Sequence, residues 1–174
     1  TYPFDSTGQD NNDSLLQAVI NNSMPLGAQG VVLNFPTGTF LFNQSISLPN
    51  NVVIKGQGAA STTLNFQLSS SDHAVKVIGT DLTDTSALIQ NAARDSNILI
   101  VANSSKFNIG DWIRIIQHDS DLVNNSWAYN TVGQITQITD LINNNEILTS
   151  SSLRMSYDLT RQPYIMKMNP AKNV

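Results

Sequence analysis

Hydrophobic residues recur at helical spacing only near the start of the chain. Residues 10–24 begin with a polar run that suits a helix N-terminus, because Asp and Asn side chains accept hydrogen bonds from the first backbone amides. The pattern predicts one short amphipathic helix, which Pro25 and Gly27 end. The apolar residues at the spacing of one helix face are Leu15, Leu16, Val19 and Ile20.

The pattern changes after Gly30 to short runs rich in β-branched and aromatic residues. Apolar and polar residues alternate within each run, which predicts strands that bury one face each. Phe35-Pro-Thr-Gly38 and Gly56-Gln-Gly58 lie where the chain turns sharply between runs. A strand about every 10 to 12 residues is typical of either a sandwich or a solenoid of stacked coils, and spacing alone favours neither. The runs are residues 31–35, 39–42, 45–48, 52–55, 62–66 and 74–78.

Three segments together resemble a known family. They are Tyr2-Pro-Phe-Asp-Ser-Thr-Gly-Gln-Asp-Asn-Asn-Asp-Ser14, Val31-Val-Leu-Asn-Phe-Pro-Thr-Gly-Thr-Phe-Leu-Phe42 and Ser47-Leu-Pro-Asn-Asn-Val-Val-Ile-Lys-Gly-Gln-Gly58. Their order is similar to the N-terminal segment of the pectate-lyase-like right-handed parallel β-helix proteins, over residues 2–66. The resemblance implies stacked parallel coils, with the helix covering the open apolar end of the stack and its unpaired strand edges.

A second pattern starts near Ala87. Longer alternating runs at residues 97–101, 106–116, 131–139 and 145–149 are joined by Asn-rich, hairpin-like turns, which predicts an antiparallel unit. This part is similar to the small β-barrel insertions of some β-helices, mainly through Phe107-x-x-Gly110-Asp111-x-Ile113-x-Ile115. Residues 163–168 predict one further strand, and Lys172-Asn-Val174 repeats the pattern of Asn50-Asn-Val52.

The expected fold is therefore all-β. It comprises a cap helix and the first coils of a right-handed parallel β-helix at residues 1–86, a small antiparallel β-barrel-like insertion at 87–160, and a return to the β-helix at 161–174. Because the last residues match the start of a coil, we expect a truncated chain. A further coil or a second chain is expected to stack at Lys172 to Val174.

Composition and charge exclude several classes of protein. Of the 174 residues, 40% are hydrophobic and only 13% are charged, which indicates a folded chain. The net charge of -4 and the scattered Lys and Arg residues argue against nucleic acid as a partner. No apolar run is long enough to span a membrane, and the lack of Cys removes thiolate metal sites. A start without Met is typical of a cut signal peptide or a shortened chain, and we expect a secreted or cell-surface protein.

The segment from His118 to Tyr129 is the strongest candidate binding site. Sugar rings present apolar C–H faces that stack on aromatic rings, while amide groups bind the hydroxyls. Trp127 and Tyr129 beside Asn124 therefore predict a site for a polysaccharide or surface glycan. The alternative is that Trp127 plugs the barrel or packs against the coils.

No catalytic residue is identified. Glycosidases need two carboxylates with one held protonated, and the sequence singles out no such pair. A uronic-acid lyase needs a basic group, for which surface placement is the alternative. No cofactor is identified either, and calcium stays open through the pairs Asp10 with Asp13 and Asp119 with Asp121, for which a helix cap and a solvated loop are the alternatives. The candidate basic residues are Arg114, Arg154, Arg161 and Lys167.

The resemblance implies the N-terminal part of a carbohydrate-active β-helix protein acting on polysaccharide, uronic-acid lyase-like or glycoside hydrolase-like. This segment would be capping and accessory, with the catalytic residues beyond residue 174. The alternative is a non-catalytic glycan-binding or adhesive module, similar to tailspikes. A third hypothesis is a purely structural stalk.

Overall fold

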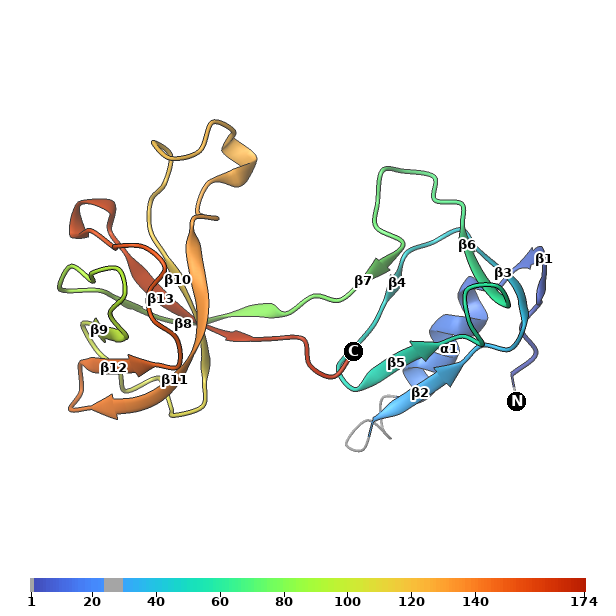
Figure 1. Ribbon diagram of the computed structural model, residues 1–174, viewed down its shortest axis with the longest axis horizontal. Helices are drawn as coiled ribbons and strands as arrows, with labels where there is room; N and C mark the ends of the chain where they lie inside the picture. The colour runs from blue at the N-terminus through green and yellow to red at the C-terminus, as the bar shows by residue number, and fades with distance from the viewer. Residues whose placement is uncertain (1, 24–29) are drawn as a thin grey trace. The chain divides into compact units, whose positions relative to one another are not determined.

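The computed structural model describes residues 2–23 and 30–174, so the predicted helix-ending residues Pro25 and Gly27 lie outside the described residues. The chain divides into two compact units. We call Thr1–Ile78 with Ala171–Val174 the coil unit and Gly79–Pro170 the sheet unit. Strands dominate both units (Figure 1), which confirms the all-β class.

The coil unit is built from parallel strand pairs on three faces. β2 pairs with β5, β3 with β6 and β4 with β7, so three strands of one coil stack on three strands of the next. β1 adds a further parallel partner to β3. All six predicted strands between residues 31 and 78 are confirmed in position. The strands are β1 (Thr7–Asn11), β2 (Val31–Asn34), β3 (Gly38–Phe42), β4 (Ile46–Ser47), β5 (Val52–Lys55), β6 (Thr62–Phe66) and β7 (Val75–Lys76).

The core of the coil unit is largely aromatic. Phe42 of β3 and Phe66 of β6 are register partners, and their rings stack with centroids 5.3 Å apart. Phe35 meets Phe40 edge-on at 5.0 Å. Such ring pairs add about 0.5–1.5 kcal/mol each beyond the area that they bury.

The helix α1 (Asp13–Ser23) packs its apolar face on this core. Leu16, Val19 and Ile20 are at most 4% exposed, as the helical spacing predicts. Asn12 before the helix is buried and fastens the preceding segment, because its side-chain oxygen accepts from the Asp5 amide at 2.9 Å. Whether α1 has the capping role that the resemblance implies stays a prediction.

The last residues of the chain lie beside the start of β5. The Asn51 amide donates to the Lys172 carbonyl at 3.1 Å, and the Asn173 side chain donates to the Asn51 side chain at 2.8 Å. Asn51 and Asn173 both have positive φ, of 64° and 55°. Lys172-Asn-Val174 thus lies against Asn50-Asn-Val52, the segment whose sequence pattern it repeats.

The sheet unit is one six-stranded antiparallel sheet in the order β8-β13-β10-β11-β12-β9. Its core is aliphatic, with Ile113, Ile115 and Ile165 fully buried together with Tyr157. One of the predicted Asn-rich, hairpin-like turns, at Asn143 to Asn145, joins β11 to β12. The strands are β8 (Thr80–Ala87), β9 (Ile98–Ile100), β10 (Trp112–Ile116), β11 (Gly133–Ile142), β12 (Glu146–Thr149) and β13 (Tyr164–Asn169).

A closed barrel is not seen among the described residues, which differs from the barrel-like insertion that we predicted. The outer strands β8 and β9 have no ladder between them, and their ends meet only at the isolated bridge between Leu88 and Val101. Two backbone hydrogen bonds accompany that bridge, from Ile89 to Ile100 and from Ala102 to Ala87. The sheet curls until its edges touch, but β9 is too short to complete a ladder.

The boundaries between the units also differ from the predicted ones, which lay between residues 86 and 87 and between residues 160 and 161. β8, which ends at Ala87, belongs to the sheet, because Tyr164, Ile165 and Met166 of β13 pair with it. β13 itself, predicted as the return to the β-helix, lies between β8 and β10.

Candidate functional site

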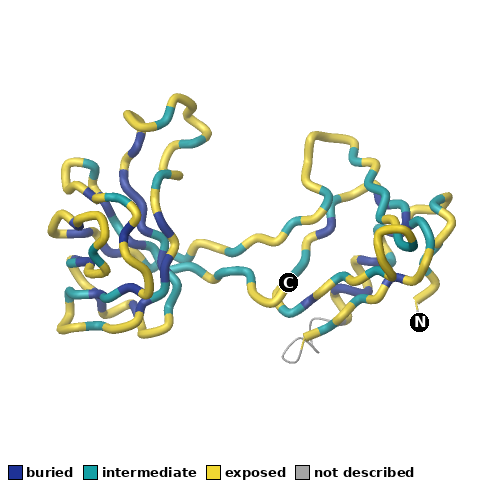
Figure 2. Tube along the Cα trace, viewed as in Figure 1, coloured by how far each residue is buried: buried dark blue, intermediate teal, exposed yellow. Residues whose placement is uncertain are grey.

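The long loop between β10 and β11 carries the predicted binding residues. It contains the short 3-10 helix η2 (Ser126–Ala128), drawn in light orange in Figure 1, and most of the loop is exposed (Figure 2). Trp127 is 83% exposed and Tyr129 is 45% exposed. Asn124 is exposed as well. Trp127 therefore does not plug the sheet unit, which was one of the two alternatives.

Asp119 fastens the far end of this loop. The carboxylate is only 1% exposed and accepts from the Asn130 amide at 2.6 Å and from the Val132 amide at 2.8 Å. Removal from water has the largest single influence on the pKa of Asp119 and raises it. The backbone amides together outweigh that influence and leave the pKa below its ordinary value of 3.8. Asp119 is therefore ionised at neutral pH and holds residues 130–132 in place.

Two arginines add further ties to the loop. Arg114 of β10 donates to the Asn130 carbonyl at 2.8 Å and pairs with Asp81 at 3.1 Å. Arg161 pairs with Asp121 at 2.6 Å at the other end of the loop. Both ends are thus fixed to the sheet, while the stretch from Asn124 to Tyr129 projects into solvent. An aromatic surface on a fastened loop loses little conformational entropy when it binds a ligand.

The other candidate residues do not converge on one place. Arg114 and Arg161 each bind a separate carboxylate, and Lys167 pairs with Asp111 at 2.7 Å. Arg154 is exposed on a turn of the sheet unit.

Three of the four carboxylates considered for calcium bind protein groups. Asp13 accepts from the backbone amides of Asn43 and Gln44, and Asp119 and Asp121 make the contacts given above. Within residues 2–23 and 30–174 no group of three or more His, Cys, Asp or Glu is placed to hold a metal ion.

Some residues that shape the loop were not predicted in their observed roles. Asp119 was considered as a metal ligand and Arg114 as a base, but both hold backbone. Their roles depend on where the loop returns to the sheet, which local sequence does not reveal. One feature can be predicted from the sequence. Because Ile113 and Ile115 point to one face of β10, Arg114 between them lies on the opposite face.

Stacked parallel coils followed by an antiparallel sheet unit define a protein of the parallel β-helix class. The family model described as rhamnogalacturonase A/epimerase, pectate lyase-like, matches residues 1–162. The chain belongs to this family, and the resemblance seen in the sequence is confirmed.

Three phage tailspikes share the fold. The Gp54 tailspike of Acinetobacter baumannii bacteriophage AP22, in complex with A. baumannii capsular saccharide, matches at 16% identity with a TM-score of 0.65, over 95% of this chain and 25% of that chain. The tailspike protein gp49 from Pseudomonas phage LKA1 matches at 19% identity with a TM-score of 0.61. The match covers 95% of this chain and 31% of that chain. The Pseudomonas phage phi297 tailspike gp61 matches at 12% identity with a TM-score of 0.67. The match covers 95% of this chain and 30% of that chain. The chain thus spans between 25% and 31% of the length of these proteins.

The comparison with curated proteins finds no match. No helix within the described ranges has the length and apolar character needed to cross a membrane.

Proposed function

We propose that this chain is the glycan-binding, accessory part of a secreted or surface-exposed protein that acts on polysaccharide. The β10–β11 loop contacts the sugar, with Trp127 and Tyr129 as stacking surfaces and Asn124 as a hydrogen-bonding group. The family membership and the saccharide-bound tailspike among the similar structures support a carbohydrate ligand.

The exposure of Trp127 carries the proposal. An indole that is 83% exposed gains nothing from folding, and Trp is among the residues that contribute most when they become buried on binding. The loop that presents it is held by one buried carboxylate and two ion pairs. A tightly held loop with an unburied aromatic tip is what a preformed sugar platform requires.

Substitution of Trp127 tests this proposal. We expect Trp127→Ala to weaken binding of polysaccharide at least about tenfold, which corresponds to about 1.4 kcal/mol. Binding to rhamnogalacturonan, polygalacturonate and capsular polysaccharide is measured by isothermal titration calorimetry. Leu122→Ala is the matched control, since Leu122 is an exposed apolar residue of the same loop. Equal affinities of both variants and the parent chain would contradict the proposal.

Three carboxyl groups have a pKa below the ordinary value. Hydrogen bonds leave the pKa of Asp158 and Asp119 below the ordinary value, and the pKa of Asp5 is lowered to about 2, first by the hydroxyl of Thr7. None of these three groups suits the role of the protonated acid that glycosidases need. On the family membership, we propose that any catalytic residues belong to other parts of a longer protein.

A non-catalytic, adhesive protein similar to tailspikes is the second candidate, and the three tailspike matches favour it. Release of new reducing ends or of unsaturated products separates the two. A longer protein that contains this chain and degrades the bound polysaccharide supports the accessory role. Binding without turnover in the longer protein supports the adhesive role.

The finer features of the fold belong to the same proposal. α1 caps the first coil of a right-handed parallel β-helix, and the sheet unit is inserted between two coils. The site at Lys172 to Val174 takes a further coil or a second chain, and the stacking of Asn173 on Asn51 supports this.

A further inference from the structure

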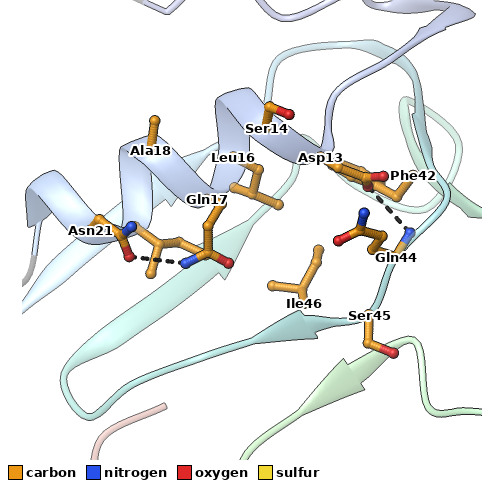
Figure 3. Close-up of a pocket in the computed structure, with 11 residues that line it drawn as sticks. Asp13, Ser14, Leu16, Gln17, Ala18, Asn21, Phe42, Gln44, Ser45 and Ile46 are labelled. Carbon is orange, nitrogen blue, oxygen red and sulfur yellow. Dashed lines mark hydrogen bonds between the residues drawn. The ribbon is translucent and has the colours of Figure 1, made fainter.

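A cavity of about 390 Å³ lies between α1 and the corner that joins β3 to β4. This volume is in the range of sites for small ligands. Figure 3 shows the side chains of Gln17 and Gln44 extending from the helix and from the corner into the space between them. Asn21 adds a further amide from the helix.

The floor of the cavity is apolar. Leu16, Phe42 and Ile46 line it, and each is at most 5% exposed because it also belongs to the core of the coil unit. A rigid apolar floor beneath a polar rim matches a ligand that has one C–H face and several hydroxyls.

Hydrogen bonds hold the rim in position on the side of the helix and the corner. The Asp13 carboxylate accepts from the Asn43 amide at 3.1 Å and from the Gln44 amide at 3.3 Å, which ties the corner to α1. The side-chain amide of Gln17 donates to the side-chain oxygen of Asn21, one helical turn away, at 2.9 Å. The side-chain amides of Gln17 and Asn21 and the backbone at Gln44 are therefore already oriented before a ligand arrives.

The next coil braces the remaining edge. The Ser45 hydroxyl donates to Asp72 at 3.0 Å, and Lys76 pairs with the same carboxylate oxygen of Asp72 at 2.6 Å. The hydrogen bond from Lys76 is the largest cause of the lowered pKa of Asp72. Asp72 thus balances the charge of Lys76. Neither residue lines the cavity, whereas Ser45, which binds Asp72, does.

The lining residues that the structure describes carry amides, hydroxyls and one carboxylate, and none of them is Lys, Arg or His. A carboxylate on the ligand would meet Asp13 without a cation to balance it, which costs free energy. The cavity therefore suits an uncharged polyhydroxyl ligand and disfavours an acidic one.

We propose that this cavity is a second carbohydrate site, which takes one uncharged sugar residue. The sugar places a C–H face on Leu16 and Ile46 and binds Gln17 and Gln44 through its hydroxyls. This site is in the coil unit and does not depend on the Trp127 loop, so either site can be correct without the other.

Amide NMR on the ¹⁵N-labelled full chain tests the proposal. Galactose, glucose and N-acetylglucosamine are titrated to millimolar concentrations, with galacturonate as the acidic comparison. We expect the neutral sugars to shift the signals of Gln17, Asn21, Gln44 and Ser45. Gln17→Ala and Gln44→Ala should each weaken this binding about tenfold, whereas Gln67→Ala, an exposed amide outside the lining, should leave it unchanged.

Each other outcome overturns the proposal. No shift at the cavity with any neutral sugar excludes the site. Shifts confined to the β10–β11 loop exclude the second site and leave the Trp127 proposal intact. Tighter binding of galacturonate than of galactose contradicts the charge argument. Retained binding in Gln17→Ala and Gln44→Ala shows that the ligand lies elsewhere, and far-UV circular dichroism checks that both variants are folded.

Discussion

At the scale of single residues, one buried carboxylate determines the shape of the proposed sugar platform. Asp119 is charged, almost inaccessible to water and satisfied by backbone amides that lie eleven and thirteen residues further along the chain. Hydrogen bonds from amides to a charged group are worth about 1.5–3 kcal/mol. Loss of its charge should therefore release the second half of the loop without opening the sheet.

The loop should respond to acid in a defined direction. Because the folded pKa of Asp119 lies below 3.8, its stabilising contribution is complete above that pH and is lost as the pH falls through the folded value. The amide NMR signals of Asn130 and Val132 should stay constant from neutral pH to about pH 4.5 and change below pH 3.8.

Two variants separate the role of Asp119 from general effects of acid. Asp119→Asn should shift both amide signals at neutral pH and remove their titration. Asp121→Asn, which loses only an exposed ion pair with Arg161, should leave them unchanged. A titration midpoint at or above 3.8 in the parent chain would be incompatible with this assignment.

The sequence pointed to Trp127 more readily than to Asp119. Two aromatic residues among Asn, Asp and Ser are visible in a short window of sequence. The partners of Asp119 are set by the return of the loop, and the amides of the α1 cavity meet only after the coil has closed. Contacts of this kind have no local pattern.

At the scale of elements, alternation predicted the strands whose inner face is apolar. β2 to β6 and β9 to β13 carry such residues, and most of these strands were expected at nearly their observed places. β7 was expected too, although its apolar residue Val75 is exposed. β8 was missed because its sequence, TDLTDTSA, contains mostly Thr and Asp at exposed positions. Its place in the sheet comes from pairing with β13. The strand predicted at 106–116 begins only at Trp112, after Gly110 turns the chain with a φ of 91°.

The corner between β2 and β3 depends on Gly38. Its φ is 144°, and a Cβ there would lie 2.6 Å from the Ser6 carbonyl oxygen. Gly58, at the corner after β5, has a φ of 118°, but a Cβ there would meet nothing within 4 Å. Gly58→Ala should therefore cost about 1–3 kcal/mol through backbone strain alone, and Gly38→Ala should cost more because a collision is added.

Urea denaturation followed by far-UV circular dichroism compares the two glycine variants. The difference between their free energies of unfolding measures the close approach of β1 and β3. Equal losses would show that Ser6 moves away freely and that the corner is less tightly packed than the structure indicates.

At the scale of the whole molecule, sequence alone anticipated two kinds of architecture but misplaced the change between them. The change was set near Ala87 because apolar alternation becomes regular there. The sheet unit instead starts at Gly79, since β8 and β13 run antiparallel and the ends of the unit, Thr80 and Asn169, are register partners.

The sheet unit should therefore fold by itself. Residues 79–170 contain an uninterrupted aliphatic core and all six strands of the sheet. When this segment is expressed alone, we expect a dispersed amide NMR spectrum and a cooperative thermal transition. A spectrum without dispersion would show that the sheet needs the coil unit for its stability.

The proposed contact between Trp127 and a glycan can be measured directly, because the chain has only two tryptophans. Trp112 lies in β10 and is partly buried, whereas Trp127 is exposed on the loop. The indole N–H signals of the ¹⁵N-labelled chain are followed during titration with rhamnogalacturonan and capsular oligosaccharides, and Trp127→Phe assigns them. We expect the Trp127 signal to shift in a saturable manner while the Trp112 signal stays in place. A Trp127 signal that is unmoved by every glycan, or a shift of Trp112 alone, would contradict the proposed contact.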